Sequence, residues 1–334
     1  HAGISYGFLL IGQDKSKQLA LDPYEGIRWG ALSAEGKKIL DPIYEQVRPV
    51  SPTRLIIMQR GQLGFVDETG KVVTPPTYDH IGGFVEGYAR CRLNGKVGLI
   101  SAQGDEVMKP EFDTLAPITA NLIKAKHLNH WKLYTPWGIQ RSRERYEIID
   151  QPVQGRIAVM AGRKWGFINL EGQEVIPLKY DEVTPFEEGY TVTREARTWR
   201  VLDLEGLVLH EGTYSRAELL PGGYLAVRQD GDWGVIHIAS GKEVVSMKYT
   251  GVKRMNEQVV GLRDGAQWGW ATLPDGKTTG PRYRSLSTLK GPFLAAREES
   301  HWQLFSAEGK RINRLAFDEM APFSEKAVLV GDKP

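Results

Sequence analysis

The chain has 334 residues, of which 41% are hydrophobic and 25% are charged, and these globular proportions exclude a disordered or collagen-like chain. Its formal net charge of +2 is too small to predict nucleic acid or an anionic membrane as the partner. The single cysteine, Cys91, excludes an internal disulfide framework and a Cys-rich zinc cluster, and no apolar run approaches the roughly 18 residues of a spanning helix.

The first segment in chain order covers residues 1–28 and is expected to form a cap or a degenerate tenth repeat. It opens with His1-Ala2-Gly3 and has no initiator methionine, as a processed start or a trimmed chain would. Removal of a signal peptide would place the protein in the bacterial periplasm or at the cell surface, and the cytoplasm is expected otherwise.

From residue 29 onward the sequence repeats with a step of 34 residues, once 35. Each unit opens with an apolar anchor: Trp29, Leu63, Val97, Trp131, Trp165, Trp199, Trp233, Trp268 and Trp302. The nine units are 29–62, 63–96, 97–130, 131–164, 165–198, 199–232, 233–267, 268–301 and 302–334, and we expect them to form one domain. A fixed period predicts a stacked array whose anchor rings are core residues; exposed rings that bind sugars are the alternative.

Each unit begins with a predicted β-hairpin, as in 165–177. Its turn glycine lies seven residues after the anchor at Gly36, Gly70, Gly104, Gly138, Gly172, Gly206 and Gly309, and eight after it at Gly241 and Gly276. Glycine at this position indicates a positive φ, and a proline near the end of the second strand, such as Pro177, indicates that pairing stops there.

The second half of each unit predicts a turn and a last strand. An aromatic residue followed by an acid recurs at Tyr44-Glu45, Tyr78-Asp79, Phe112-Asp113, Tyr146-Glu147, Tyr180-Asp181 and Phe317-Asp318. The aromatic is expected in the core and the acid in a turn or cap. Asn94-Gly95 leads into the next anchor, which predicts a hairpin between the last strand of one unit and the first strand of the next. The units are therefore expected to form a continuous antiparallel meander without helices.

The residues from Trp165 to Gly189 resemble the WG-repeat family of bacterial proteins, whose unit reads W-G-F-I-x-x-x-G-x-x-V-I-P-x-x-Y-D-x-x-x-x-F-x-E-G. The resemblance extends from about residue 21 to the C-terminus, with Lys132, Arg200 and Gln303 replacing the glycine after the anchor. It implies an all-β repeat scaffold, mostly without a described enzymatic activity, and it implies no substrate.

The fold class expected is an all-β tandem array of antiparallel meander units. About 34 residues are few for a four-stranded propeller blade, which uses roughly 40 to 45, and nine or ten blades would make a large ring. A curved open superhelix is therefore favoured over a closed propeller-like ring. The chain ends at Pro334, two residues before the next anchor is due, which indicates a truncated last unit.

Motifs for catalysis or metal binding are weak, and we expect no enzyme, no cofactor and no metal. His127 and His130 have the spacing of a metal pair but no evident third ligand, and an exposed turn is the better interpretation. Gly276-Lys277-Thr278 resembles the end of a phosphate-binding loop, but Ala271 stands where that loop requires glycine. Periodic acids are explained by turn chemistry.

A cation recurs 29 residues after the anchor, on the last expected strand: Arg92, Lys126, Arg194, Arg228 and Arg297, with Arg263 one residue later in its longer unit. Pairing with the turn acids would explain half of this column. In the sixth to eighth units, however, Ser215, Thr250 and Arg284 replace the acid while Arg228, Arg263 and Arg297 remain. We expect the whole cation column, with Arg284, to supply the binding residues for an anionic or acidic surface, and above all the unpaired arginines of these later units, because guanidinium suits carboxylate and phosphate.

The leading functional hypothesis is a non-catalytic scaffold that binds another protein through its extended surface, alone as a monomer or in complex with that partner. One version is an immunity protein that neutralises a bacterial toxin with an acidic surface. A receptor for a cell-wall glycan or other anionic ligand is the alternative, and an enzyme is third. The polar segment 140–145, in place of an apolar second strand, is expected to protect a sheet edge.

Overall fold

The computed structural model describes residues 4–14, 26–273, 275–288, 293–312, 317–322 and 328–331. All regular elements in these ranges are β-strands, and none of these residues belongs to a helix long and apolar enough to cross a membrane. The chain divides into two compact units, His1–Ile149 with Leu170–Gln173 and Asp150–Asn169 with Glu174–Pro334. The start and end of the sequence, residues 1–3 and 332–334, lie outside the described residues.

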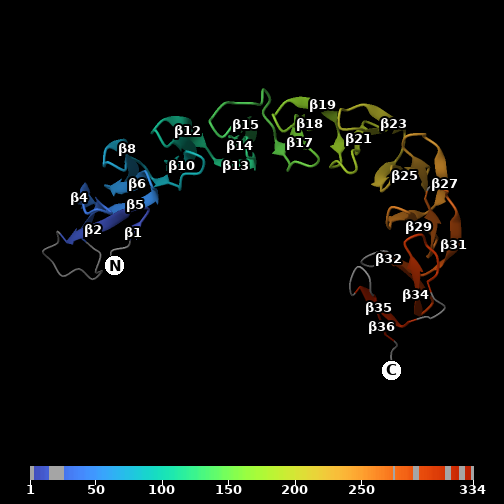
Figure 1. The fold of residues 1–334 in the computed structure, drawn as a ribbon. Coiled ribbons are helices and arrows are strands. Elements are labelled where there is room, and N and C mark those ends of the chain that lie inside the picture. Colours follow the sequence, from blue (N-terminus) through green and yellow to red (C-terminus); the bar gives the residue numbers. More distant parts are fainter. Residues whose placement is uncertain are drawn as a thin grey trace. The chain divides into compact units, whose positions relative to one another are not determined.

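The strands form small sheets that follow one another in chain order (Figure 1). The first sheet contains β1 (Ile4–Ser5), β2 (Phe8–Asp14), β3 (Ile27–Ser33) and β4 (Lys38–Tyr44). The second contains β5 (Gln46–Ser51), β6 (Arg54–Gln59), β7 (Gln62–Asp67) and β8 (Val72–Tyr78). The third contains β9 (His80–Ile81), β10 (Tyr88–Leu93), β11 (Lys96–Ser101) and β12 (Glu106–Phe112). The fourth contains β13 (Thr114–Thr119), β14 (Leu122–His127) and β15 (His130–Tyr134).

The later sheets repeat the same arrangement. The fifth contains β16 (Ile148–Ile149), β17 (Arg156–Ala161), β18 (Lys164–Asn169) and β19 (Glu174–Tyr180), and the sixth contains β20 (Glu182–Val183), β21 (Thr191–Glu195), β22 (Thr198–Leu202) and β23 (Val208–Gly212). The seventh contains β24 (Arg216–Leu220), β25 (Tyr224–Gln229), β26 (Asp232–His237) and β27 (Glu243–Tyr249). The eighth contains β28 (Gly251–Arg254), β29 (Val259–Asp264), β30 (Gln267–Thr272) and β31 (Thr278–Tyr283). The ninth contains β32 (Ser285–Thr288), β33 (Phe293–Glu298) and β34 (His301–Ser306), and β35 (Glu319–Pro322) pairs with β36 (Val328–Gly331).

Each sheet is shared between two sequence repeats. In the second sheet, β5 and β6 belong to 29–62, whereas β7 and β8 belong to 63–96. The hairpin predicted at Asn94-Gly95 is confirmed, because β10 pairs antiparallel with β11 and both turn residues have positive φ, 51° and 75°. The continuous meander is wrong in one respect: after each aromatic–acid pair the chain leaves one sheet and starts the next. The anchor therefore lies on the third strand of its sheet.

Thirty-four residues, which are few for a four-stranded propeller blade, suffice for a four-stranded sheet here. Two-residue turns such as Asn94-Gly95 connect the second and third strands, and short turns around the periodic glycine connect the third and fourth. Those glycines, from Gly36 to Gly309, all have positive φ, as predicted. Few residues are consequently spent on connections.

The glycine that follows the anchor permits a bulge in the fourth strand. A Cβ built on Gly166 would lie 2.5 Å from the carbonyl oxygen of Ile176 and 2.8 Å from the carbonyl carbon of Pro177. At this point the pairing of β18 with β19 shifts register, from Trp165 opposite Tyr180 to Phe167 opposite Ile176. Only a residue without a side chain allows so close an approach of two backbones.

The hydrophobic cores lie between consecutive sheets. One core joins Phe167 and Ile176 of the fifth sheet to Phe186 and Leu202 of the sixth, and all four side chains are buried. Further cores join other neighbouring pairs of sheets in the same way. A single sheet buries too little apolar surface alone, so stacking supplies the burial that stabilises each repeat.

The fourth sheet departs from this plan at residues 140–145. The sequence predicts a polar strand here, and this prediction is wrong: the segment is an irregular stretch, and the isolated bridges around it join Tyr134 with Gln140 and Trp131 with Tyr146. The buried hydroxyl of Ser142 accepts a hydrogen bond from the Leu133 amide at 3.0 Å. Lys132 stands where most other sheets have glycine, so its side chain excludes the bulged fourth strand.

Candidate binding surface

The periodic acid caps the two-residue turn that precedes the next anchor, which agrees with the predicted turn role. Glu45 accepts hydrogen bonds from the amides of Arg60 and Gly61, both at 2.9 Å. Asp79 accepts one from the Asn94 amide at 2.7 Å, and Asp181 one from the Ala196 amide at 2.7 Å. Each carboxylate therefore joins the start of a sheet to the turn between its second and third strands.

A lysine immediately before the anchor is the close ionic partner of the turn acid. Lys96 lies 2.5 Å from Asp113, and Lys164 lies 2.6 Å from Asp181. Sequence reasoning paired these acids with the cation column instead and missed the lysines. The signal was available, because Lys96 and Lys164 both directly precede their anchors. Only the strand register shows that this position faces the acid that directly follows the fourth strand of the same sheet.

Asp181→Asn is expected to lower the thermal unfolding temperature at pH 7. The Lys164 ammonium and the Ala196 amide lower the pKa of Asp181 below its usual 3.8 in the folded chain. A folded-state pKa below the unfolded value means that the carboxylate stabilises the fold above pH 3.8 and loses this effect as the pH falls below it.

The measurement is the unfolding temperature of variant and wild type between pH 7 and pH 2. The difference between the two proteins should shrink below pH 3.8. Asp232→Asn, an exposed acid with no side-chain partner among the described residues, serves as the control and should show no such trend. A difference that stays constant across the range would contradict the capping role.

The cation column lies directly opposite the anchor column. Strand register pairs Arg194 with Trp199, Arg228 with Trp233, Arg263 with Trp268, Arg297 with Trp302, Lys126 with Trp131 and Arg92 with Val97. The guanidinium carbons of Arg194 and Arg263 lie 5.9 Å from the centres of their tryptophan rings, and the Lys126 ammonium lies 5.8 Å from its ring. Cation–π attraction therefore stabilises these three cations, whereas Arg92 lies opposite Val97, which has no ring.

The anchors themselves are less buried than expected for core residues. All seven tryptophans in the column are only partly buried, and several pack against the rim of a core, whereas Val97 is buried. The buried aromatic is the one on the neighbouring strand, such as Tyr180 opposite Trp165 or Tyr283 opposite Trp268. Each anchor thus lies between a cation and a buried ring.

The members of the cation column differ in their partners. Arg194 is half-buried and pairs with Asp181, at 3.7 Å, and with Glu182, which holds its pKa above the usual value. Arg228, Arg263 and Arg297 are exposed, as are Arg92 and Arg284. No acidic side chain of the described residues lies within 4.0 Å of these five arginines.

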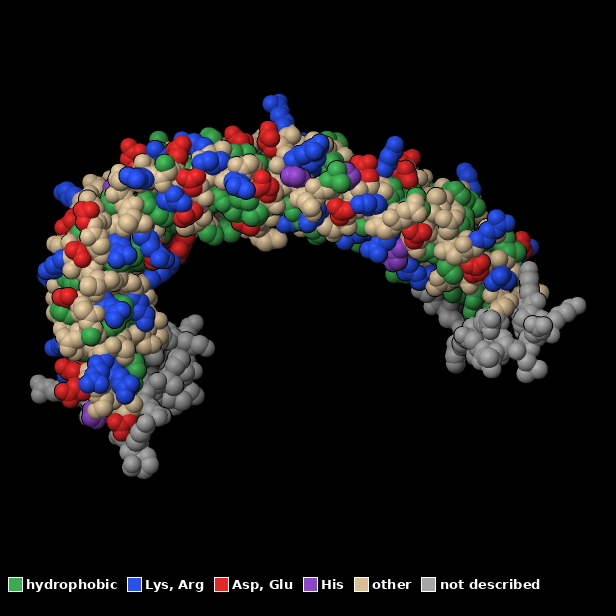
Figure 2. Space-filling model, turned by 180° about the vertical axis from the view of Figure 1, so that it is seen from behind, with side chains coloured by type: hydrophobic (Ala, Val, Ile, Leu, Met, Phe, Trp, Pro, Cys, Tyr) green, Lys and Arg blue, Asp and Glu red, His purple; other side chains and the backbone are tan. Residues whose placement is uncertain are grey.

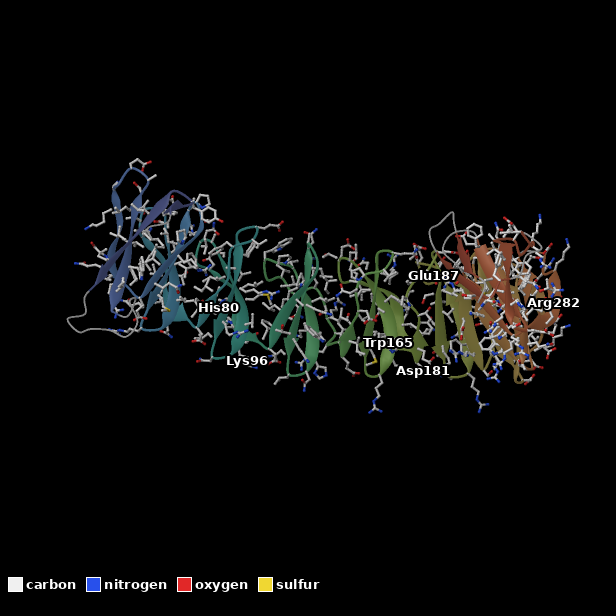
Figure 3. The ribbon with its side chains drawn as sticks, turned by 90° about the horizontal axis from the view of Figure 1, so that it is seen from below. His80, Lys96, Trp165, Asp181, Glu187 and Arg282 are labelled. Carbon is white, nitrogen blue, oxygen red and sulfur yellow. The ribbon has the colours of Figure 1, made fainter. Side chains whose placement is uncertain are left out.

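Two of the exposed arginines are held by their own turns. Arg228 donates a hydrogen bond from Nε to the carbonyl of Gly231 at 3.0 Å, and Arg263 donates one to Gly265 at 2.9 Å. These bonds fix the guanidinium groups beside the turn that precedes the anchor strand. Figure 3 shows the corresponding end of the strands at Trp165 and Asp181, with Glu187 toward the opposite end.

A cleft of about 1100 Å³ lies between the sixth and seventh sheets, both in the second unit. Its walls include Arg194 and Trp199 on one side and Arg216 and Glu218 on the other. Arg216 forms an ion pair with Glu218 at 2.7 Å and lies directly opposite Arg228 on the next strand. The cleft is therefore continuous with the arginine column.

Comparison with known proteins places the sequence pattern in a family. The family described as WG containing repeat matches residues 64–96 and 165–199. These two segments contain WG repeats. No curated protein matches the chain.

Several solved structures are distantly similar to the chain. Hsv2p of Kluyveromyces lactis matches with 10% identity and a TM-score of 0.30, covering 68% of this chain and 92% of that one. The Pan2 WD40 domain of Neurospora crassa matches with 9% identity and a TM-score of 0.30, covering 65% and 81%. A eukaryotic initiation factor matches with 10% identity and a TM-score of 0.36, covering 97% and 99%. Such scores carry no inference about closure or ligands.

The remaining sequence motifs lie in or beside turns between strands. His127 and His130 face each other across β14 and β15, and the Nδ1 atom of each ring lies within hydrogen-bond distance of a backbone carbonyl, of Glu111 and Leu128 respectively. Among the described residues no group of three potential ligands could hold a metal. Gly276 and Lys277 belong to the turn before β31, where the Lys277 amide bonds to Asp275.

Proposed function

We propose that the chain is a non-catalytic scaffold that binds an acidic protein partner through the arginines of its later WG repeats. The observation that carries this proposal is the row of Arg228, Arg263 and Arg297. These three side chains occupy matching positions in three consecutive sheets, are exposed, and have no acidic partner within 4.0 Å among the described residues. Guanidinium groups presented at a regular step suit a surface that carries several carboxylates.

The distribution of charge in the second unit supports the same proposal. Figure 2 shows one face of this unit, on which lysine and arginine side chains gather over its later sheets. The corresponding acid is present in the fifth repeat, as Asp181, and replaced in the next three by Ser215, Thr250 and Arg284. An acidic protein would supply the charge that these repeats lack.

The finer architecture proposed with this function is a curved open superhelix. Within the second unit, Arg254 of the eighth sheet donates a hydrogen bond to Glu187, which follows β20 of the sixth sheet, at 2.7 Å. This ion pair joins the sixth and eighth sheets across the seventh sheet, and it supports curvature toward the end of the strands at which Glu187 lies. Curved arrays commonly bind partners along an extended surface.

Reversal of the row, Arg228→Glu with Arg263→Glu and Arg297→Glu, is expected to abolish capture of the partner from lysate of the native host. The control is Lys242→Glu with Lys277→Glu and Lys310→Glu, which makes the same change of charge at exposed lysines. In the seventh and eighth sheets these lysines lie at turns at the other end of the anchor strand. The control should retain the partner.

The measurement is the identity and amount of protein bound by each variant. Undiminished capture by the arginine variant would contradict the proposal. A glycan recovered without any protein would instead favour the second candidate, a receptor whose ligand occupies the cleft beside Trp199. Capture of a toxin would support the version in which the chain acts as an immunity protein.

A further inference from the structure

The backbone position of the turn acid is conserved in the repeats that lack the acid. The Asp181 amide donates a hydrogen bond to the carbonyl of Arg194 at 2.7 Å. The Ser215 amide donates in the same way to Arg228, and the Thr250 amide to Arg263, both at 2.8 Å. Only the side chain differs between these sheets, so its replacement removes a carboxylate without moving the chain.

The turns that the acid would cap also keep their conformation. Ala196, which Asp181 caps, has φ of 55°, and Asp230 at the matching position has φ of 50°. The corresponding residue of the eighth sheet, Gly265, has φ of 56°. The turn amides of the seventh and eighth sheets are therefore arranged like those that hold a carboxylate in earlier sheets.

The shorter side chains do not take over the capping role. The Ser215 hydroxyl donates to the Arg228 carbonyl at 3.0 Å, and the Thr250 hydroxyl donates to the Arg263 carbonyl at 3.2 Å. The arginines use Nε for their turn carbonyls, and their Nη groups have no partner among the described residues. Ser215 and Thr250 therefore do not supply the side-chain acceptor that Asp181 offers to its turn amide in the sixth sheet.

The cleft between the sixth and seventh sheets gives access to Ser215 and to the turn after β25. Ser215, Arg216, Gln229 and Asp230 all line it. Arg216 and Arg228 face each other across β24 and β25, and like charges at such a cross-strand pair are unfavourable without a neighbouring anion. Glu218 neutralises Arg216 in part, at 2.7 Å, and leaves Arg228 without a carboxylate.

We infer that the seventh and eighth sheets each bind a carboxylate of an acidic peptide segment, at the turn after β25 and at the turn after β29. Each carboxylate takes the place that Asp181 occupies in the sixth sheet, and it accepts hydrogen bonds from turn amides and from Arg228 or Arg263. This inference rests on the proposed function, because it names the chemical group by which the acidic partner is recognised.

The test uses a fluorescein-labelled hexaglutamate peptide and the full chain, with binding measured by fluorescence anisotropy. Ser215→Asp with Thr250→Asp restores the missing acids, which should occupy the turn amides and weaken binding by about tenfold or more. Ser215→Ala with Thr250→Ala leaves the position open and should bind within about twofold of wild type. Ser240→Asp with Thr278→Asp adds the same charge at exposed sites away from these turns and should also bind nearly normally.

The outcomes separate this inference from the proposed function. Restored acids should also raise the thermal unfolding temperature, which shows that the variant is folded. If that variant binds hexaglutamate as tightly as wild type while the arginine reversal does not, the arginine row binds acids but the turns do not, and the inference is wrong. The inference is equally wrong if the wild-type chain does not bind hexaglutamate, or if it binds a hexalysine peptide as tightly as hexaglutamate.

Discussion

Gly70→Ala is expected to lower the free energy of unfolding by about 2–5 kcal/mol. Two effects add at this turn glycine. Its φ is +88°, which costs an L-residue about 1–2 kcal/mol. A Cβ at Gly70 would also lie 2.2 Å from the carbonyl oxygen of Ile39 in the preceding sheet, so the sheets must separate or the turn must move. Overpacking of this kind costs about 1–3 kcal/mol.

Gly36→Ala is the matched control, because it changes the same residue of the first repeat. Its φ is +83°, but nothing lies within 4 Å of the added Cβ. Only the conformational cost remains, about 1–2 kcal/mol. Chemical denaturation of the two variants and of wild type measures both effects. Equal losses would show that contact between sheets contributes nothing at Gly70.

This pair of glycines shows what periodicity can and cannot predict. The recurrence of glycine at a fixed distance from the anchor predicted a turn with positive φ, and every member of the series has it. The contact between Gly70 and Ile39 depends on how consecutive sheets stack. Stacking brings together residues of consecutive repeats, and the period of the sequence does not say which of them touch.

The candidate surface was predictable to a similar extent. The sequence singled out Arg228, Arg263 and Arg297 and the loss of the neighbouring acids, and these arginines are exposed without acidic partners among the described residues. It did not reveal that the cations lie directly opposite the anchors, because this depends on the register between strands. Nor did it reveal the lysine partners of the acids, since Lys164 and Asp181 are 17 residues apart and belong to different repeats.

The exceptions in the repeat have structural causes that a pattern alone cannot supply. Lys132 and Gln303 replace the glycine after the anchor in sheets that have three strands among the described residues. Arg200 replaces it in the sixth sheet, where β22 pairs residue by residue with β23 from Trp199 to Val201, without the usual shift. The glycine is therefore required only where the fourth strand bulges toward the third, and its replacement predicts an altered strand.

Gly166→Ala is accordingly expected to lower the free energy of unfolding by about 3 kcal/mol or more, since the added methyl group meets backbone atoms that no rotamer change can move. Its Cβ would lie 2.5 Å from the Ile176 carbonyl oxygen, where the fourth strand of the fifth sheet bulges. Relief of this contact requires β19 to move away from β18, which would open the core around Phe167 and Ile176.

Arg200→Ala makes the opposite test at the matching position of the next repeat. The sixth sheet has no bulge there, so only the ion pairs of Arg200 with Glu195, at 2.8 Å, and with Glu211, at 3.1 Å, are lost. Surface pairs of this kind contribute about 0–1 kcal/mol each. Urea unfolding of both variants compares the two positions directly. If Arg200→Ala destabilised the chain as much as Gly166→Ala, the close approach of the bulged strand could not be the reason that glycine follows the anchor.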